Sequence, residues 1–442
     1  MRCFLLLTLL FLSPTYAQSQ KQIKNQIMEL SRLETEANES LSKGPNYLKS
    51  SKGIYLETLM IPLNFIDLKS INEQGQKIKN SLIVSGERSI EYFLWPLNPE
   101  DQKYRHELEW ELKTHQIPYK KGPWIPVHRT ASRSFLIHGR TDLPFSYKGS
   151  TDKVPGPFQR SKQLFTSEAL ATGQISAYFL KKQKELQHKK IPLHHLNFLP
   201  DTLVVNTNFS EQSLLFRPLA PLFQWQQTRP STQKLKYIPA FTFLHNQEGL
   251  KLAQKAHLDI FQLLEVVVQS IAQSNVELLL YFGSIVTSNH LQQYLIEMDE
   301  VKNLPTGQVF LRDLSDLEIH HDFLEQDSNY GPEMLNEREF SLNNLNYRPY
   351  HTPSFNPLLQ DFEPQWVSSN TLARFLASVY FKAYNEYFEK LTQINLVTKF
   401  YKEESLRETN GYWTQKPKAV PTQDLFRWKI YHNTHCQSLL SI

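Results

Sequence analysis

Apolar residues recur every three or four positions in three long stretches of the chain, which is the spacing of an amphipathic helix. These stretches are residues 169–186, 250–272 and 372–391. The first follows Thr166-Ser167-Glu168, a sequence typical of a helix start. We therefore predict three long helices, one before the middle of the chain and two in its second half.

Short apolar runs between these stretches predict strands. They lie at 203–205, 214–216 and 237–244. Residues 119–160 are dense in Pro, Gly and aromatic residues, which is typical of irregular strands and turns. The order of elements predicts an α+β fold in which antiparallel strands pack against a mostly helical C-terminal half.

Two polar clusters flank a predicted hairpin, with strands near 291–298 and 309–314 and a turn at Leu304–Gly307. The first cluster, Ser288–Gln293, contains His290, and the second is the pair Arg312-Asp313. The hairpin would bring the two clusters side by side. An imidazole, amides and a carboxylate in one place could bind phosphates and magnesium. The alternative is an Arg–Asp pair that ties two strands, with His290 as a capped surface residue.

The N-terminus has the pattern of a secretory signal peptide over residues 1–17, with one positive charge, a short apolar core and Ala17 before a polar start. A buried N-terminal strand is the alternative. Export to the periplasm or the extracellular space is therefore expected. The rest divides into an N-terminal region (18–118), a domain with a loop of nucleotide-binding type (119–200) and a C-terminal palm-like and helical domain (201–442).

Composition narrows the class of protein. The net charge is +4 with Lys and Arg dispersed along the chain, which argues against a nucleic-acid partner. Only 14 glycines occur and none forms a Gly-rich phosphate loop, so Rossmann and P-loop folds are disfavoured. Cys436 is the only cysteine beyond the signal, so no internal disulfide is expected. No later apolar run was expected to span a membrane, and the sequence does not indicate an oligomeric state.

Residues 120–435 resemble the IucA/IucC siderophore synthetase family in four stretches that keep the family's order. His290-Leu291-Gln292-Gln293 and the later Arg312-Asp313 are similar to a Glu-x-His-x-Gln-Asn motif followed by a strand that ends in Arg-Asp. The other stretches are Ile125–His128, similar to "IPVHPW" with Arg129 in place of proline, Lys148–Lys153, at the position of the nucleotide loop, and Leu425–Lys429, similar to the closing segment.

The resemblance implies an ATP- and magnesium-dependent ligase. A small, citrate-like carboxylate would be adenylated, and an amine or alcohol would then displace AMP. Asp313 would hold magnesium, and His290, Gln292 and Gln293 would contact the phosphates or the nucleotide. The α-phosphate would be clamped by Ser150, Lys153 and Lys162, and His128 would face the carboxylate, so that His128 and His290 are the expected catalytic residues. The residues around Ser150 and Lys153 also fit an ordinary polar turn.

The chain departs from the family pattern at several of these positions. Ser288 stands where the family has Glu, Gln293 stands where it has Asn, and the nucleotide loop lacks Ser-x-Arg-Thr. These departures, with the signal peptide, support a second hypothesis. In it the chain is an exported, non-catalytic binding protein of the cell envelope that retains the fold.

Overall fold

The computed structural model describes residues 21–35, 53–99, 101–131, 133–152, 163–227, 234–244, 248–286, 289–320, 339–340, 352–353, 355, 369–392, 401–409 and 412–417. The chain forms two compact units, which we call unit 1 (Met1–Ala169 and Asp201–Ile238) and unit 2 (Leu170–Pro200 and Pro239–Ile442). The chain thus passes between the units three times. The expected boundary at 118/119 lies within unit 1, whereas 200/201 coincides with a passage between units. Residues 1–17, 153–162, 288 and 418–442 of the earlier predictions lie outside the described residues.

Unit 1 is built on two antiparallel sheets. The larger has the strand order β1 (Ile54–Leu56), β7 (Ile125–Ala131), β8 (Ser134–Ile137), β9 (Phe145–Lys148), β12 (Ser213–Pro218), β11 (Leu203–Thr207) and β3 (Ile66–Ser70). The smaller has the order β4 (Ile83–Ser85), β5 (Glu91–Pro96), β2 (Thr58–Pro62) and β6 (Lys120–Lys121). One continuous core of buried apolar residues joins the sheets and includes Phe93, Leu108 and Phe216. Unit 1 also contains a helix over 21–35 and α5 (Ala220–Gln227).

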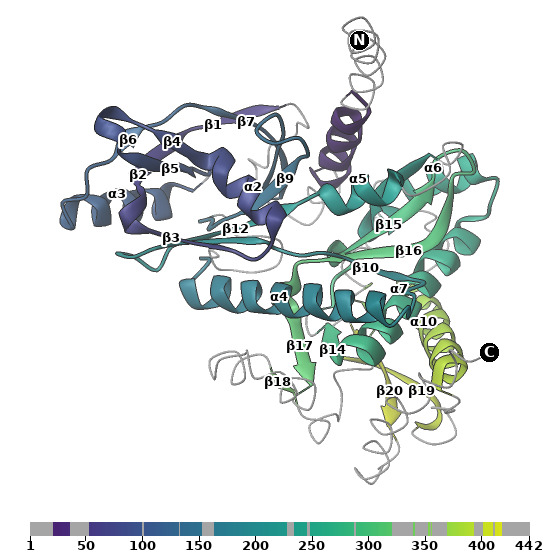
Figure 1. Cartoon of the computed structure of the whole chain (residues 1–442). Helices are drawn as coiled ribbons and strands as arrows, with labels where there is room; N and C mark the ends of the chain where they lie inside the picture. Colours follow the sequence, from purple (N-terminus) through teal and green to yellow (C-terminus); the bar gives the residue numbers. More distant parts are fainter. Residues whose placement is uncertain are drawn as a thin grey trace, which may run out of the picture. The chain divides into compact units, whose positions relative to one another are not determined.

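Two helices of unit 1 begin at side-chain caps. In α2 (Glu73–Leu82) the Asn72 side chain accepts from Gly75 N, and in α3 (Gln102–Thr114) the Asp101 side chain accepts from Tyr104 N. The helix α2 packs on β3, β11 and β12 (Figure 1). A Cβ atom at Gly75 would lie 2.1 Å from the Thr202 carbonyl oxygen, so the close approach of α2 requires glycine there.

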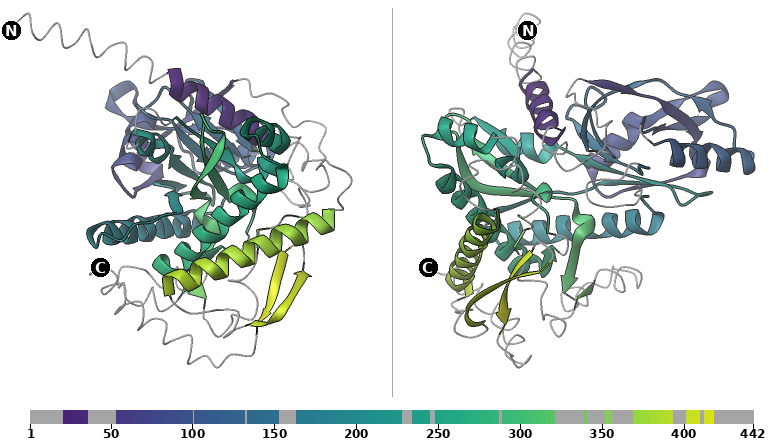
Figure 2. Two further views of the ribbon diagram at one scale, coloured as in Figure 1. Left: turned by 90° about the vertical axis from the view of Figure 1, so that its right-hand side faces the viewer. Right: turned by 180° about the vertical axis from the view of Figure 1, so that it is seen from behind.

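Unit 2 combines long helices with short sheets. The strands β10 (Leu196–Leu199), β16 (Leu304–Arg312) and β15 (Tyr294–Asp299) follow one another in one sheet, where β10 is parallel and β15 antiparallel to β16. The helix α7 (Ile260–Phe282) packs on β10 and β16, and α10 (Ser369–Thr392) lies beside α7 (Figure 2). The strand β13 (Leu235–Pro239) belongs to unit 1 up to Ile238, and α4 (Thr166–His188) belongs to unit 2 from Leu170 on. The remaining elements of unit 2 are α6 (Glu248–Ala256), β14 (Ser284–Val286), β17 (Leu317–His320), β18 (Glu339–Phe340), β19 (Tyr401–Thr409) and β20 (Tyr412–Pro417).

The predicted α+β fold with mainly antiparallel strands is confirmed, and so are the helices expected over 169–186 and 372–391. The single helix predicted over 250–272 is wrong, because the chain forms α6 and α7 there. His257 has a positive φ of 54°, and the Asp259 carboxylate accepts from Phe261 N at 2.7 Å to start the second helix. By length and composition α7 is apolar enough to span a membrane, contrary to the expectation of no such run. However, 78% of its most apolar window is buried, as in a core helix.

The turn predicted at Leu304–Gly307 is also wrong, since these residues belong to β16. The hairpin turns over residues 300–303 instead, because the Asp299 carboxylate accepts from Val301 N (2.9 Å) and Lys302 N (3.0 Å). Asp299 and Leu304 are therefore the last pair of the ladder.

Candidate functional site

The β15–β16 hairpin of unit 2 brings the two predicted polar clusters together. Tyr294 pairs with Leu311 in the ladder, which sets the ends of both strands side by side. Beyond this pair, Arg312 Nε donates to the Gln292 carbonyl oxygen at 2.8 Å. Arg312 thus ties the two ends of the hairpin, with a carbonyl oxygen as its acceptor.

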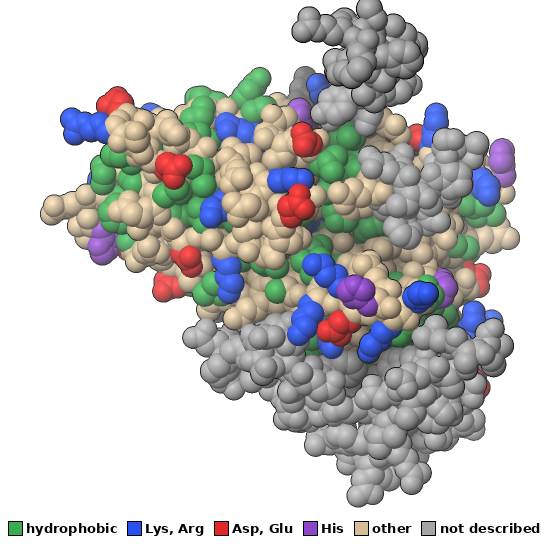
Figure 3. All heavy atoms as spheres, viewed as in Figure 1, with side chains coloured by type: hydrophobic (Ala, Val, Ile, Leu, Met, Phe, Trp, Pro, Cys, Tyr) green, Lys and Arg blue, Asp and Glu red, His purple; other side chains and the backbone are tan. Residues whose placement is uncertain are grey.

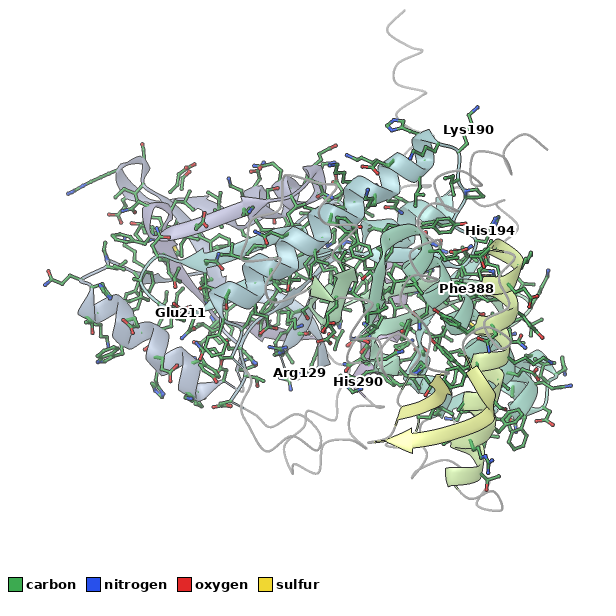
Figure 4. All side chains as sticks on the ribbon, turned by 90° about the horizontal axis from the view of Figure 1, so that it is seen from below. Arg129, Lys190, His194, Glu211, His290 and Phe388 are labelled. Atoms are coloured by element: carbon green, nitrogen blue, oxygen red, sulfur yellow. The ribbon has the colours of Figure 1, made fainter. Side chains whose placement is uncertain are left out.

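The turn at His290–Gln293 is held by the amide of Gln293. Its Oε1 accepts from His290 N at 3.0 Å, and its Nε2 donates to Asp316 Oδ2 at 2.8 Å. Gln293 is buried, so both ends of this amide serve the fold. The neighbouring Gln292 and His290 are exposed, and Figure 4 labels His290. Of the three residues predicted in this turn, these two offer side chains to a ligand.

A buried polar network anchors the same turn and was not predicted. The hydroxyl of Tyr294 lies 2.7 Å from Asn289 Oδ1 and 3.2 Å from Asn275 Oδ1, and Asn275 Nδ2 donates to the Tyr380 hydroxyl at 2.9 Å. Burial raises the pKa of Tyr294 well above its ordinary value, so this hydroxyl stays protonated. The network links α7, β15 and α10 and fixes the residue that precedes His290.

Asp313 follows β16 in a left-handed conformation, with φ 62° and ψ 60°. Its Oδ1 accepts from the Ser315 hydroxyl at 2.8 Å. A non-glycine residue in this region is strained, and such strain is concentrated at functional sites. The described residues contain no group of three or more His, Cys, Asp or Glu side chains that could hold a metal. One carboxylate therefore fits Mg²⁺ that is bound mainly by water and phosphates, and it does not fit an all-protein metal cage.

His128 and Ser150 lie in unit 1, where β8 separates the strands that carry or precede them. His128 is buried on β7, and its Nε2 is 3.3 Å from His138 Nε2. Burial lowers the pKa of His138, and the positive charges of His128 and Lys24 lower it further. Ser150 follows β9, and its hydroxyl accepts from Leu164 N at 3.0 Å. The predicted residues of unit 2 thus lie together at the β15–β16 hairpin, whereas His128 and Ser150 lie in unit 1.

Sequence reasoning missed two further residues next to Ser150. Together with Ser150, Asp101 and Tyr147 line a cavity of about 20 Å³ in unit 1. Burial raises the pKa of Asp101 to about 7, and the Asp152 and Glu107 carboxylates add to the shift against the Tyr104 N–H and Lys103. No local motif marks these residues, because a helix cap and a strand residue form the cavity only in the folded unit.

One face of the molecule shows how the charged side chains of the described residues are distributed. On the face that Figure 3 presents, Lys and Arg side chains of the described residues are scattered among acidic and polar side chains.

Comparison with known proteins places the fold. No protein-family model matches the chain, and no curated protein sequence does. Solved structures do: the petrobactin biosynthesis protein AsbB of Bacillus anthracis has a TM-score of 0.53 at 12% identity, over 86% of this chain and 70% of AsbB. The aerobactin synthetase IucC of Klebsiella pneumoniae has a TM-score of 0.52 at 13% identity, over 78% of this chain and 64% of IucC. The aerobactin synthetase IucA of the same organism has a TM-score of 0.50 at 13% identity, over 86% of this chain and 74% of IucA.

The chain therefore spans somewhat less than two thirds of the length of IucC. At this level of identity the likeness is one of fold. The fold of this chain is that of the siderophore synthetases.

Proposed function

We propose that the protein is an ATP- and magnesium-dependent ligase that joins a small carboxylate to an amine or an alcohol. One observation carries the proposal: a strained Asp313 and the exposed His290 and Gln292 lie at the same end of one hairpin, within a siderophore-synthetase fold. A structure of this fold is also known for ATP-bound IucA, which supports a nucleotide as one substrate.

The roles are those that the resemblance to the siderophore synthetases implies. The Asp313 carboxylate would hold Mg²⁺ on the nucleotide, and His290 and Gln292 would donate to phosphate oxygens. Gln293 would act through the turn that its amide holds. His128 would face the carboxylate substrate, and Ser150, with Lys153 and Lys162, would contact the α-phosphate.

The reaction would have two steps. A carboxylate oxygen of the substrate would bond to the α-phosphorus of ATP, and pyrophosphate would leave. The amine nitrogen or alcohol oxygen would then attack the acyl carbon and lose its proton, and AMP would leave with the electron pair of the broken acyl–oxygen bond.

The test is AMP and pyrophosphate release by the purified chain with ATP, Mg²⁺, citrate and a panel of amines and alcohols. We expect Asp313→Asn to lower AMP formation at least tenfold while the free energy of unfolding stays within about 0.5 kcal/mol of wild type. Asp316→Asn is the matched control, because this carboxylate accepts the Gln293 amide and its loss should lower stability. The absence of AMP, and of any nucleotide-dependent thermal shift, with every substrate pair would contradict the ligase.

That negative outcome would favour the exported, non-catalytic binding protein instead. N-terminal sequencing from cell fractions tests export separately: a mature chain that starts at Gln18 in the periplasm or medium supports it, and an intact Met1 in the cytosol contradicts it.

A further inference from the structure

The cavity of unit 1 lies at the N-terminal end of α3 and is lined by Asn98, Asp101, Tyr147 and Ser150 among others. Its volume of about 20 Å³ is enough for one water-sized group. Its walls are both apolar and polar, and they come from α3, β5, β9 and β12 with the loops that follow them. It is therefore a small, chemically mixed pocket inside a single compact unit.

The Tyr147 hydroxyl is the first sign that the cavity has an occupant. Tyr147 is 1% exposed, and its ring stacks on Phe135 at 5.3 Å between centroids, which fixes the direction of the side chain. Within the part of the chain that the structure describes, this buried hydroxyl has no hydrogen-bond partner. Buried hydroxyls are nearly always bonded to protein or to an ordered small molecule. A group in the cavity would supply the missing partner.

The charge around the cavity indicates the sign of that group. Asp101 Oδ1 accepts from Tyr104 N at 3.0 Å, and Asp152 Oδ2 accepts from Gln102 N (2.9 Å) and Lys103 N (3.2 Å). Two carboxylates thus occupy the N–H groups at the start of α3, which leaves that helix end unsuited to an anion. The other oxygen of Asp152 is buried and has no partner among the described residues.

Among the described residues, the positive charge of Lys103 acts on Asp101, Arg105 lines the cavity, and the positive charge of Arg129 acts on the Tyr147 hydroxyl. Lys103 forms an ion pair with Glu107, and Arg105 lies 2.7 Å from Glu57 and 3.2 Å from Glu109. The guanidinium nitrogens of Arg105 are therefore shared with two other carboxylates, and the buried Asp101 is left in surroundings that favour its protonated form. A bound cation would reverse that preference.

We propose that this cavity binds a monovalent cation of ammonium size between the Asp101 carboxylate and the Tyr147 hydroxyl oxygen. Both are oxygen ligands suited to K⁺ or NH₄⁺, and a primary ammonium group offers the same charge and donors. At pH 8, where Asp101 is mostly ionised, a single water would bond to the hydroxyl but would leave the Asp101 charge uncompensated, and an anion would meet two carboxylates. The inference goes beyond the ligase and does not rest on it, because binding is measured without ATP.

The experiment compares thermal unfolding of the full chain at pH 8 in KCl, NH₄Cl, ethylammonium chloride and tetramethylammonium chloride at one ionic strength. Tetramethylammonium is too large for the cavity and serves as the reference. We expect K⁺ or NH₄⁺ to raise the unfolding midpoint by roughly 2–4 °C at saturation. A response to ethylammonium at lower concentration than to K⁺ would identify an amine head group, and a response to K⁺ and NH₄⁺ alone would identify a free ion.

Two variants and a control locate the site. Asp101→Asn and Tyr147→Phe should each raise the half-saturating K⁺ or NH₄⁺ concentration at least tenfold. Tyr237→Phe is the matched control in the same unit, because its hydroxyl donates to the Leu222 carbonyl oxygen at 2.8 Å, and its response to cations should equal that of wild type. Thallium(I), a K⁺ substitute with a strong anomalous signal, should give a peak between Asp101 and Tyr147 in crystals of the wild-type chain.

The response should also depend on pH. Asp101 is protonated at pH 5, where the cation effect should fall to that of the Asp101→Asn variant, and Asp152, Glu107, Lys103 and Arg105 are the charged groups that face it. Equal midpoints in all four salts at pH 8, or a cation effect that both variants keep, would overturn the proposal and assign the cavity to water.

Discussion

Each unit buries a carboxylate, and the two carboxylates differ in how completely they are satisfied. Glu277 of unit 2 is 0% exposed and accepts from three consecutive backbone N–H groups, of residues 194–196, at 2.9–3.0 Å, and from the Tyr387 hydroxyl at 2.8 Å. Asp101 of unit 1 is 6% exposed and accepts from one backbone N–H among the described residues. The Tyr147 hydroxyl lines the same cavity and has no hydrogen-bond partner among the described residues.

Burial of a carboxylate therefore does not by itself identify a ligand-binding site. Glu277 holds the start of β10 against α7 and α10, and its four donors leave little for a ligand to add. Asp101 caps α3 with one oxygen and faces a cavity, so a ligand has both room and unsatisfied groups there. We therefore assign a structural role to Glu277 and propose a binding role for Asp101, and variants at these and neighbouring positions test the two roles.

The largest effect is expected at Glu277. Glu277→Ala leaves three backbone N–H groups and the Tyr387 hydroxyl buried without their acceptor, so we expect the free energy of unfolding to fall by about 3–5 kcal/mol. Urea denaturation of the purified chain measures the loss. Glu265→Ala is the matched control on the same helix, where Glu265 accepts from the Gln269 side chain alone among the described residues, and it should change stability by less than about 0.5 kcal/mol. Equal losses of unfolding free energy would mean that Glu277 contributes no more to stability than Glu265 does.

A smaller effect is expected at Gln293, which extends the comparison to the hairpin. Gln293→Ala removes an amide that is bonded at both ends, so we expect a loss of about 1–3 kcal/mol. Gln292→Ala, the exposed neighbour, should leave stability unchanged and weaken nucleotide binding. Parallel denaturation and nucleotide titrations separate the two roles, and the reverse pattern would make Gln293 the ligand contact and Gln292 the structural residue.

At Asp101 we expect a contribution to the free energy of unfolding that depends on pH. Its pKa is raised from 3.8 to about 7, so between these values the folded protein keeps a proton that the unfolded chain has released. Stability should therefore fall as pH rises through this window. Asn caps a helix as well as Asp does, so Asp101→Asn should remove the fall and gain on the order of 1 kcal/mol over wild type at pH 8. Denaturation at pH 5 and pH 8 in tetramethylammonium salt tests this, and parallel pH curves would contradict it.

Local pattern was enough to predict the hairpin and the polar clusters at its ends, because both strands are apolar and lie close together in the sequence. It failed on the turn, because Leu304-Pro305-Thr306-Gly307 has the composition of a turn while the Asp299 carboxylate fixes the bend four residues earlier. Gly307, with φ 90°, is accommodated within β16 instead. A side chain that bonds to backbone N–H groups outweighed turn propensity there.

Long-range partners explain the other failures. The helix predicted to end at Ala272 continues through Asn275 and Glu277, and both are buried and bonded to residues more than 80 positions away or on α10. The helix ends only at Gly283, which adopts the left-handed cap conformation. Asp101 and Tyr147 are likewise brought together only by the folded sheet, so no local spacing could have identified their cavity.

The smallest effect, expected at Tyr147, is the sharpest test of the comparison. In cation-free buffer the Tyr147 hydroxyl has no partner to lose among the residues that the structure describes, so Tyr147→Phe should change the free energy of unfolding by no more than about 0.5 kcal/mol. Tyr237→Phe removes the same atom from a bonded hydroxyl and should cost about 1 kcal/mol. Denaturation of both variants under identical conditions gives the difference. If Tyr147→Phe costs more than Tyr237→Phe, the Tyr147 hydroxyl already has a partner in the fold, and the two buried carboxylates differ less than their donors indicate.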